Sequence, residues 1–185
     1  MPFGRKSAKP RPFFDAAGLF DYAVRSLGRA MRSEADLRRL MKMRVEPEAT
    51  GEAKIDAVVE RLKGYGYLND ATFAETYARL RHVYQKLGQR RVRQDLQQKG
   101  IGSELIATTL EARYGQTNEE ALAREHLERK RIRKPTNDKE AARIMRRLVT
   151  AGFSTGVIYK VLRQWDVPDE TLAALDNLDD ETHEE

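Results

Sequence analysis

The chain has 185 residues, of which 34% are charged and 40% are hydrophobic, so it can form hydrophobic cores beneath a very polar surface. No stretch approaches the roughly 18 apolar residues of a membrane-spanning helix, and the basic first residues lack the apolar segment of a secretory signal. The lack of cysteine excludes disulfides and thiolate chemistry and agrees with a reducing compartment. We therefore expect a cytoplasmic protein with no membrane partner.

The net charge of +5 is unevenly distributed along the chain. Residues 166 to 185 contain nine Asp or Glu and no Lys or Arg, which leaves 34 basic against 20 acidic residues in positions 1 to 165, a net charge of +14. Such an excess is typical of a protein that meets a polyanion or an acidic protein surface. A well-solvated helical surface explains the composition equally well.

Helix-start and helix-stop residues predict nine helices in chain order. Apolar residues at helical spacing follow side chains that can cap a helix at Asp15, Ser33, Asn69 or Asp70, Ser103, Thr117 or Asn118, Asn137 and Ser154. Two more helices carry Ile55 to Leu62 and Val92 to Leu96. Expected stops are Gly100, Gly115, Ile132, Gly152 and the residue before Pro168. Because no residues alternate with a period of two, the predicted fold class is all-α.

The helices repeat in groups of three. Six residues recur 52 positions later in the chain: Val92, Leu96, Gly100, Ile101, Ile106 and Leu110 match Ile144, Leu148, Gly152, Phe153, Ile158 and Leu162. Leu37, Met41, Ile55 and Val59 form a first copy of the pattern, with a loop expected over residues 45 to 51. Units of this size bury little surface alone, so we expect three stacked three-helix repeats in an elongated, curved array.

The predicted domain organisation follows from these repeats. The first repeat covers residues 15–68, the second residues 69–116 and the third residues 117–167. A flexible basic N-terminal tail, residues 1–14, precedes them, and an acidic C-terminal tail, residues 168–185, follows.

Four segments carry a family resemblance: Arg32 to Leu37, Gly66 to Ala74, Gly88 to Ile101, and Gly152-Phe153. Together, and in this order, they closely resemble the RecX family of bacterial regulators of the RecA recombinase, over about residues 16 to 165. The resemblance implies a cytoplasmic, monomeric regulator of recombination, DNA repair and the SOS response. It implies binding to the RecA filament on single-stranded DNA, and inhibition of the ATPase, strand-exchange and co-protease activities of RecA.

Two positions depart from the family pattern. Arg44-Val45 stands where a Lys-Gly stop is usual, and Ala151 replaces a basic residue before Gly152-Phe153. The first departure agrees with the longer loop of the first repeat. The second could remove one basic contact of the third repeat.

One candidate binding surface lies on the helix that carries Val92 and Leu96. At 100° per residue, its face opposite the apolar residues consists of Arg90, Arg93, Gln94 and Gln97. With Lys99 at the helix end, these side chains suit phosphate or carboxylate partners. The alternative is a solvated face, and Arg91, Asp95 and Lys99 are spaced to pair within the helix.

A second candidate surface is the basic stretch from Arg124 to Arg147, which has ten Lys or Arg against four acidic residues. Its densest run is placed at a predicted helix end and comprises Arg129, Lys130, Arg131, Arg133 and Lys134. Because like charges this close repel one another, a contact with DNA or with an acidic RecA surface would stabilise them. A solvated helix end is the alternative.

Catalysis is not expected, because His82, His126 and His183 are isolated and no phosphate-binding glycine loop is present. We predict no catalytic, cofactor or metal site, and interpret His82 and His126 as residues of polar helix faces. The aromatic residues at helical spacing or at repeat junctions are interpreted as packing residues: Phe73, Tyr77, Tyr84, Tyr65, Tyr67 and Trp165.

Two other binding functions remain open. A sequence-specific helix-turn-helix protein, on double-stranded DNA, shares the outline of two helices joined at Gly100-Ile101-Gly102. However, Glu104 to Ala107 offer few base-reading side chains at the start of its second helix. A passive helical adaptor would bind with little dependence on salt.

Overall fold

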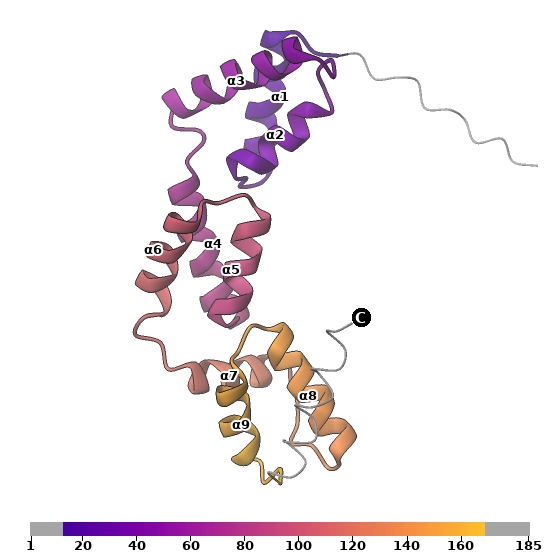
Figure 1. Cartoon of the computed structure of the whole chain (residues 1–185), viewed down its shortest axis with the longest axis vertical. Coiled ribbons are helices and arrows are strands. Elements are labelled where there is room, and N and C mark those ends of the chain that lie inside the picture. The colour runs from indigo at the N-terminus through magenta and orange to yellow at the C-terminus, as the bar shows by residue number, and fades with distance from the viewer. Residues whose placement is uncertain (1–12, 169–185) are drawn as a thin grey trace, which may run out of the picture. The chain divides into compact units, whose positions relative to one another are not determined.

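The computed structural model describes residues 13–168, and these residues contain nine helices and no strand (Figure 1). The all-α prediction is confirmed. The helices are α1 Ala16–Arg29, α2 Glu34–Lys42, α3 Ala49–Gly64, α4 Asp70–Gln85, α5 Gln89–Gln98, α6 Ser103–Tyr114, α7 Glu119–Arg129, α8 Asp138–Thr150 and α9 Thr155–Arg163. The two predicted tails lie almost wholly outside the described residues. No described helix is long and apolar enough to cross a membrane.

Side-chain caps begin most of the helices where the sequence predicts them. Each cap accepts a hydrogen bond from a backbone N–H that the first helical turn leaves unpaired. The capping residues are Asp15, Ser33, Asn69, Asn118, Asn137 and Ser154. The cap predicted at Ser103 is wrong, because α6 already begins at this residue and Gly102 precedes it without a side-chain hydrogen bond.

Five of the described helices end in the same hydrogen-bonded closure. Just beyond the helix, a backbone N–H donates to the carbonyl five residues earlier, and the residue directly before this donor takes a positive φ angle. The closures of α3, α5, α7, α8 and α9 place Gly66, Gly100, Arg131, Gly152 and Asp166 in this conformation. The stops predicted at Gly100 and Gly152 are confirmed.

The chain divides into two compact units, residues 1–73 and residues 74–185. In the first unit, α1, α2 and α3 pack on one another around a core that excludes water. The extended segment before α1 is attached to the end of α2 by a hydrogen bond of 2.8 Å from Phe14 N–H to the Arg44 carbonyl. The buried core side chains are Leu19, Ala23, Leu37, Met41, Val45, Ile55, Val58, Val59, Leu62 and Leu68.

The second unit contains the two repeats that match at an offset of 52 positions. Every apolar pair of this match is buried: Val92 and Ile144, Leu96 and Leu148, Ile101 and Phe153, Ile106 and Ile158, Leu110 and Leu162. The glycine pair, Gly100 and Gly152, shares a positive φ. Matched side chains therefore occupy equivalent buried positions in the two repeats, which supports the predicted repeat. The exact repeat boundaries and the curvature of the array stay predictions.

Three details of the sequence interpretation are wrong. The helix α3 begins at Ala49, inside the predicted loop. Gly51 is buried so close to the preceding backbone that a Cβ there would lie 2.0 Å from the Glu46 carbonyl oxygen. The helix α7 ends at Arg129 rather than near Ile132, since the closure at Arg131 turns the chain.

The third detail concerns aromatic side chains that were expected to pack. Phe73 is buried, whereas Tyr65, Tyr67 and Tyr84 are 57%, 59% and 55% exposed.

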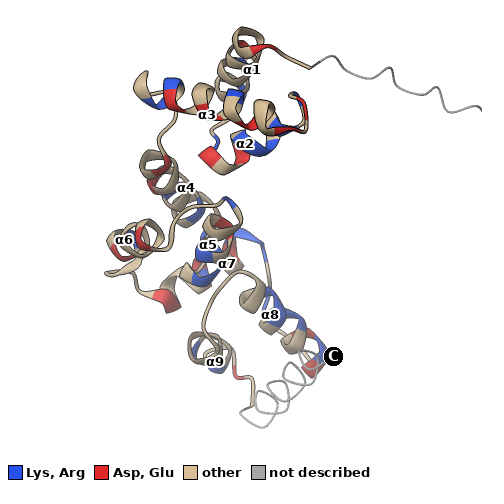
Figure 2. Cartoon of the chain, turned by 45° about the horizontal axis from the view of Figure 1, so that its top comes forward, with Lys and Arg blue, Asp and Glu red and all other residues tan. Residues whose placement is uncertain are grey.

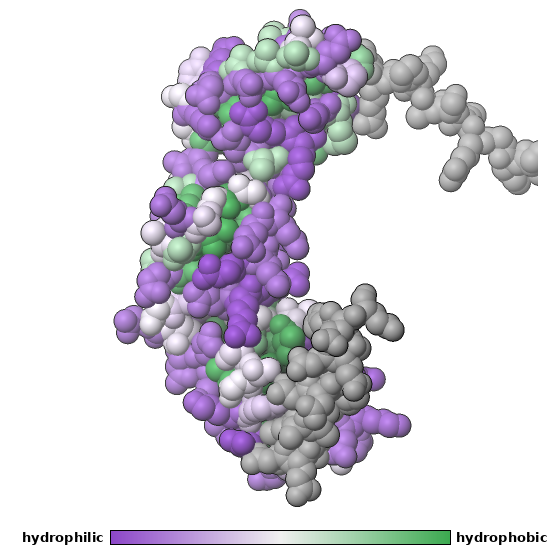
Figure 3. Space-filling model, viewed as in Figure 1, coloured by the Kyte–Doolittle hydropathy of each residue, from purple (hydrophilic) through white to green (hydrophobic). Residues whose placement is uncertain are grey.

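Most of the visible surface of both units is hydrophilic, with hydrophobic residues confined to small patches (Figure 3).

Candidate functional site

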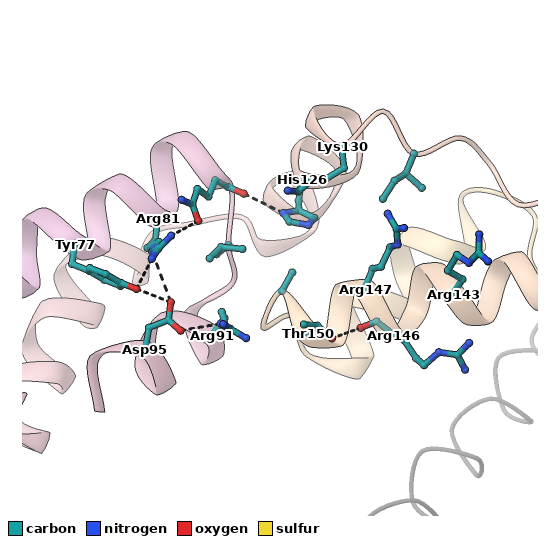
Figure 4. A pocket seen from close by; sticks show the side chains of 14 residues that line it. Tyr77, Arg81, Arg91, Asp95, His126, Lys130, Arg143, Arg146, Arg147 and Thr150 are labelled. Atoms are coloured by element: carbon teal, nitrogen blue, oxygen red, sulfur yellow. Dashed lines mark hydrogen bonds and ion pairs between the residues drawn. The ribbon is translucent and has the colours of Figure 1, made fainter. Parts of the chain in front are cut away.

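The second unit contains an open cleft of about 660 Å³. Helices α4 and α5 and the loop between them form one side, and α7, α8 and the loop between them form the other (Figure 4). Six cationic side chains line it against a single carboxylate. The lining residues are Tyr77, Arg81, Gln85, Leu87, Arg91, Asp95, His126, Lys130, Ile132, Arg143, Arg146, Arg147, Thr150 and Ala151.

The carboxylate of Asp95 organises one side of the cleft. It accepts a hydrogen bond of 2.9 Å from the Tyr77 hydroxyl and forms an ion pair of 2.9 Å with Arg91. Arg81 donates to the Tyr77 hydroxyl at 2.7 Å and lies 3.8 Å from the Asp95 carboxylate. Burial raises the pKa of Tyr77, and the adjacent Asp95 charge raises it further. Two arginines thus share the single charge of Asp95 and are held in fixed positions where α4 meets α5.

The cations on the other side of the cleft have no such counterpart. Lys130, Arg143, Arg146 and Arg147 form no ion pair with any carboxylate of the described chain. Figure 4 shows Arg147 extending from α8 toward the side on which Lys130 and His126 lie, while Arg146 points the other way. Positive side chains at this density repel one another until an anion approaches. The cleft therefore presents an attractive surface for phosphate or carboxylate groups.

His126 is a structural residue at the back of the cleft. Its side chain is buried, contradicting its assignment to a polar helix face, and its ring meets the Phe153 ring edge-on at 6.0 Å. Burial lowers the pKa of His126, and the charges of Lys130 and Arg129 add to this effect. The ring is then neutral near pH 7, and its Nδ1–H donates to the Gln85 carbonyl at 3.1 Å. His82 was misassigned in the same way, because it is half-buried against Tyr114.

Backbone contacts between two glycines join the two sides of the cleft. Gly88 N–H, at the start of α5, donates to the Ala151 carbonyl at the end of α8 over 2.8 Å. A Cβ on Gly88 would lie 2.3 Å from the Gly152 carbonyl oxygen, and a Cβ on Gly152 would lie 2.2 Å from the Arg91 nitrogen. Only glycine fits at either position. We call this contact the glycine joint.

The sequence-predicted site residues are distributed over several surfaces. Arg90, Arg93, Gln94 and Gln97 are exposed on α5, as their spacing predicts, but they line none of the cleft. Lys99 is half-buried at the α5 cap. The helix-end run is exposed, and Figure 2 shows its positive charge continuing into α8.

Only part of that run reaches the cleft. Lys130 lines it, whereas Arg133 and Lys134 line an adjoining hollow of about 230 Å³ together with Arg143 and Arg147. Lys134 is paired with Asp166 at 2.5 Å. Arg129 and Arg131 line neither of these two hollows.

Three cleft residues were missed when the densest run was chosen from the sequence: Arg143, Arg146 and Arg147. A signal was present, because they recur at i, i+3 and i+4 on α8 beside the buried Ile144 and Leu148. The Asp95 contacts with Tyr77 and Arg81 join α4 to α5 across 14 to 18 positions, and helix periodicity carries no signal for them.

Comparison with known proteins agrees with this architecture. A family model described as the second three-helix domain of RecX matches residues 69–110. The regulatory protein RecX of Leptothrix cholodnii is 33% identical over 144 residues, which cover 78% of this chain and 87% of that protein. The chain belongs to the RecX family. The regulatory protein RecX of Thermobifida fusca is 30% identical over 162 residues, covering 85% of this chain and 83% of that protein.

Two crystal structures of RecX proteins share the fold. One, titled regulatory protein RecX, has a TM-score of 0.61 at 24% identity, covering 80% of this chain and 73% of its own. The other, RecX from Lactobacillus salivarius, has a TM-score of 0.59 at 20% identity, covering 82% and 96%.

The RecX-like sequence segments have a physical explanation in this structure. Gly88 and Gly152, from two of these segments, meet in the glycine joint. Ala151, where a basic residue was expected from the resemblance, is buried and its carbonyl accepts the Gly88 hydrogen bond. Among the described residues, no group of three or more His, Asp or Glu could hold a metal ion.

Proposed function

We propose that this RecX-family protein regulates homologous recombination and DNA repair by binding the RecA filament on single-stranded DNA. Binding lowers the ATPase, strand-exchange and co-protease activities of RecA. The protein acts by binding, without catalysis, as a monomer in the cytoplasm. Membership of the RecX family, whose curated relatives are named regulatory proteins, supports this role.

The observation that carries the proposal is the set of unpaired cations on one side of the cleft. Lys130, Arg143 and Arg147 form no ion pair in the described chain, although the charge of Arg143 helps to lower the pKa of Glu140. The arginines opposite them are held by Asp95. A RecA filament offers DNA phosphates and protein carboxylates, and guanidinium groups bind both in bidentate geometry. The cleft is wide open to solvent, as a groove that receives a polymer must be.

The exposed face of α5 and the helix-end run extend this surface. Arg90, Arg93, Gln94, Gln97 and Lys99 supply contacts from the second repeat. The corresponding contacts of the third repeat come from Arg129, Lys130, Arg131, Arg133 and Lys134. Both sets are exposed or half-buried, so their hydrogen-bonding groups can reach a partner.

RecA ATP hydrolysis on single-stranded DNA tests the proposal. The wild-type chain is expected to slow hydrolysis at amounts below those of RecA, because restraint of filament growth affects many RecA subunits at once. Charge reversal by Arg143→Glu and Arg147→Glu should weaken this inhibition by about tenfold or more, since two attractive contacts become repulsive. Arg90→Glu with Arg93→Glu should weaken it as well. Unchanged hydrolysis at saturating wild-type protein would contradict the proposed function.

A matched control separates local charge from net charge. Arg39→Glu with Lys42→Glu makes the same change in net charge on α2, at exposed residues already paired with Asp36 and Glu52. This variant should inhibit nearly as well as wild type. If both double variants lose inhibition equally, the cleft is not the site and only the overall charge matters.

A further inference from the structure

The last described residues lie beside the candidate cleft. Asp166, in the turn that closes α9, pairs with Lys134, and Lys134 lines the hollow of about 230 Å³ that adjoins the cleft. The cleft and this hollow share three lining residues: Ile132, Arg143 and Arg147. We call the two together the basic depression. The chain that follows Asp166 therefore starts at the edge of the basic depression.

The residues that follow are strongly acidic. Residues 169–185, which we call the acidic segment, lie outside the described residues and contain eight Asp or Glu and no Lys or Arg. They begin three positions after Asp166. Ten residues span up to about 33 Å when extended, which exceeds the roughly 20 Å length of α8. The acidic segment is therefore long enough to follow the whole cationic helix.

The net charge of the described residues differs between the two units. Positions 74 to 168 contain 20 Lys or Arg and 11 Asp or Glu, a net charge of +9, whereas positions 13 to 73 contain ten of each. The side chains of the acidic segment carry a charge of −8. The segment is therefore attracted to the second unit and not to the first.

Within the second unit, the excess positive charge is concentrated in the basic depression. Four exposed cations line it and form no ion pair among the described residues: Lys130, Arg133, Arg143 and Arg147. Arg143 and Arg147 extend from one side of α8, one helical turn apart (Figure 4). Hydrogen bonds from Thr136 lower the pKa of Glu140, and the charge of Arg143 adds to this effect. One carboxylate leaves most of this positive charge uncompensated.

The basic depression also has an apolar part. Leu87 and Ile132 line the cleft and are only half-buried. Between its acidic residues, the acidic segment carries three leucines: Leu172, Leu175 and Leu178. A phosphate backbone offers charge without such apolar groups, whereas this segment matches both the cations and the apolar part.

We infer that the acidic segment binds the basic depression of the same molecule and competes there with the anionic partner. Its carboxylates pair with the four unpaired cations, and its leucines cover the apolar part. Because the segment is tethered at the edge of the site, its effective concentration there is on the order of millimolar. Individually weak ion pairs are then sufficient to fill the site. The segment thus lowers the apparent affinity of the protein for its partner.

This inference deepens the proposed function, on which it rests only for the identity of the partner that is displaced. A partner with few negative charges displaces the segment poorly, whereas a dense polyanion displaces it well. The acidic segment therefore makes the cleft selective. Its contact with the basic depression is measurable without DNA and without RecA, so that assay can fail while the RecA hydrolysis assay succeeds, and the reverse also holds.

A peptide of residues 169–185 tests the contact. The receptor is the full chain with each acidic residue of the segment changed to its amide, which we call the amide chain. The changes are Asp169→Asn, Glu170→Gln, Asp176→Asn, Asp179→Asn, Asp180→Asn, Glu181→Gln, Glu184→Gln and Glu185→Gln. By fluorescence anisotropy at about 0.05 M salt, where screening is weak, the labelled peptide should bind the amide chain about tenfold or more tightly than wild type. Equal binding to both chains would overturn the inference.

Charge reversal in the amide chain locates the contact. Arg143→Glu with Arg147→Glu should weaken peptide binding by about tenfold or more, since two attractive contacts become repulsive. Arg39→Glu with Lys42→Glu makes the same change in net charge on α2 and should weaken it by less than about twofold. Thermal melting checks that both variants are folded. If the two double variants lose peptide binding equally, only the overall charge matters and the inference is wrong.

A second peptide separates a seated segment from diffuse attraction between charges. Leu172→Ser, Leu175→Ser and Leu178→Ser together keep every charge of the peptide. This peptide should bind the amide chain about tenfold more weakly than the natural one, because its apolar contacts are lost. Equal binding of the two peptides would contradict a segment seated on the apolar part.

Labelled oligothymidylate in place of the peptide measures the competition. The amide chain should bind it about tenfold more tightly than wild type, because no segment has to be displaced. In the Arg143→Glu, Arg147→Glu background the same eight replacements should improve binding by less than about threefold, since the basic depression no longer attracts the segment. The same gain in both backgrounds would come from net charge alone and would exclude the competition.

Discussion

The two compact units use their positive charges differently. In the first unit, five Lys or Arg are paired with carboxylates: Arg38, Arg39, Lys42, Lys54 and Lys63. In the second unit, Arg143, Arg146 and Arg147 form no ion pair among the described residues, and they lie along one helix that faces a cleft. Net charge alone cannot distinguish these cases. The second unit also pairs five Lys or Arg with carboxylates: Arg81, Lys86, Arg91, Lys134 and Lys160. What distinguishes the second unit is that cations without an ion pair gather along one helix beside the cleft.

The largest effect on the second unit should come from the glycine joint. Gly152→Ala places a Cβ about 2.2 Å from the Arg91 nitrogen and forces alanine to a φ of +90°, so unfolding free energy should fall by about 3 kcal/mol or more. Denaturant unfolding of the full chain measures it. Gly156→Ala is the control, because its Cβ meets no atom within 4 Å and alanine favours the α9 helix. Equal stability of the two variants would show that the joint tolerates a side chain.

The intermediate effect is a loss of stability at acidic pH. The first unit contains no histidine, whereas burial lowers the pKa of His126 and His82 in the second. The unfolded chain then binds protons that the folded chain does not. Stability is therefore complete above the unfolded pKa near 6.5 and falls as pH decreases below it, by up to about 1.4 kcal/mol per pH unit for each histidine.

Unfolding measured at several pH values between about 7.5 and 5 checks this dependence. The replacement His126→Gln should lower stability at pH 7.5 but reduce its slope with pH, because one of the two titrating groups is gone. If the slope of stability against pH stays unchanged, His126 is protonated equally in the folded and unfolded states. Carboxylates of both units titrate at lower pH and set the lower limit of the window.

The smallest effect on unfolding free energy should come from removing an exposed ion pair of the first unit. Lys42→Met removes an exposed ion pair with Glu52 and should change unfolding free energy by no more than about 0.5 kcal/mol. Arg147→Met, which breaks no ion pair, should change it equally little. Calorimetric melting of both variants measures these changes in stability. A large loss of unfolding free energy for Lys42→Met alone would mean that ion pairs stabilise the first unit. The difference in charge pairing between the two units would then serve stability rather than binding.

Most of the fold could be predicted because local chemistry determines it. Capping side chains such as Ser33 and Asn118 act within one helical turn. Gly100 and Gly152 take the positive φ angle that closes a helix, which is also a local requirement. The start of α3 was mispredicted because Gly51 and Pro47 favour a loop locally, whereas packing of Gly51 on the Glu46 backbone decides in favour of helix.

The candidate cleft was less predictable because it depends on contacts between elements that are distant in sequence. The exposed face of α5 follows from periodicity and was found. The cleft requires α8 to meet the loop that carries Lys130, and the burial of His126 requires Gln85 and Phe153, which periodicity does not reveal. Tyr65 and Tyr67 were assigned to packing because aromatic residues usually are buried, a tendency that says nothing about a particular turn.

The glycine joint also has a consequence for the entropy of binding. Because the start of α5 is bonded directly to the end of α8, no flexible linker separates the charges of the second repeat from those of the third. A ligand that contacts both repeats would find them already in place. Little ordering of the backbone would then oppose association, so modest individual contacts could add up to firm binding.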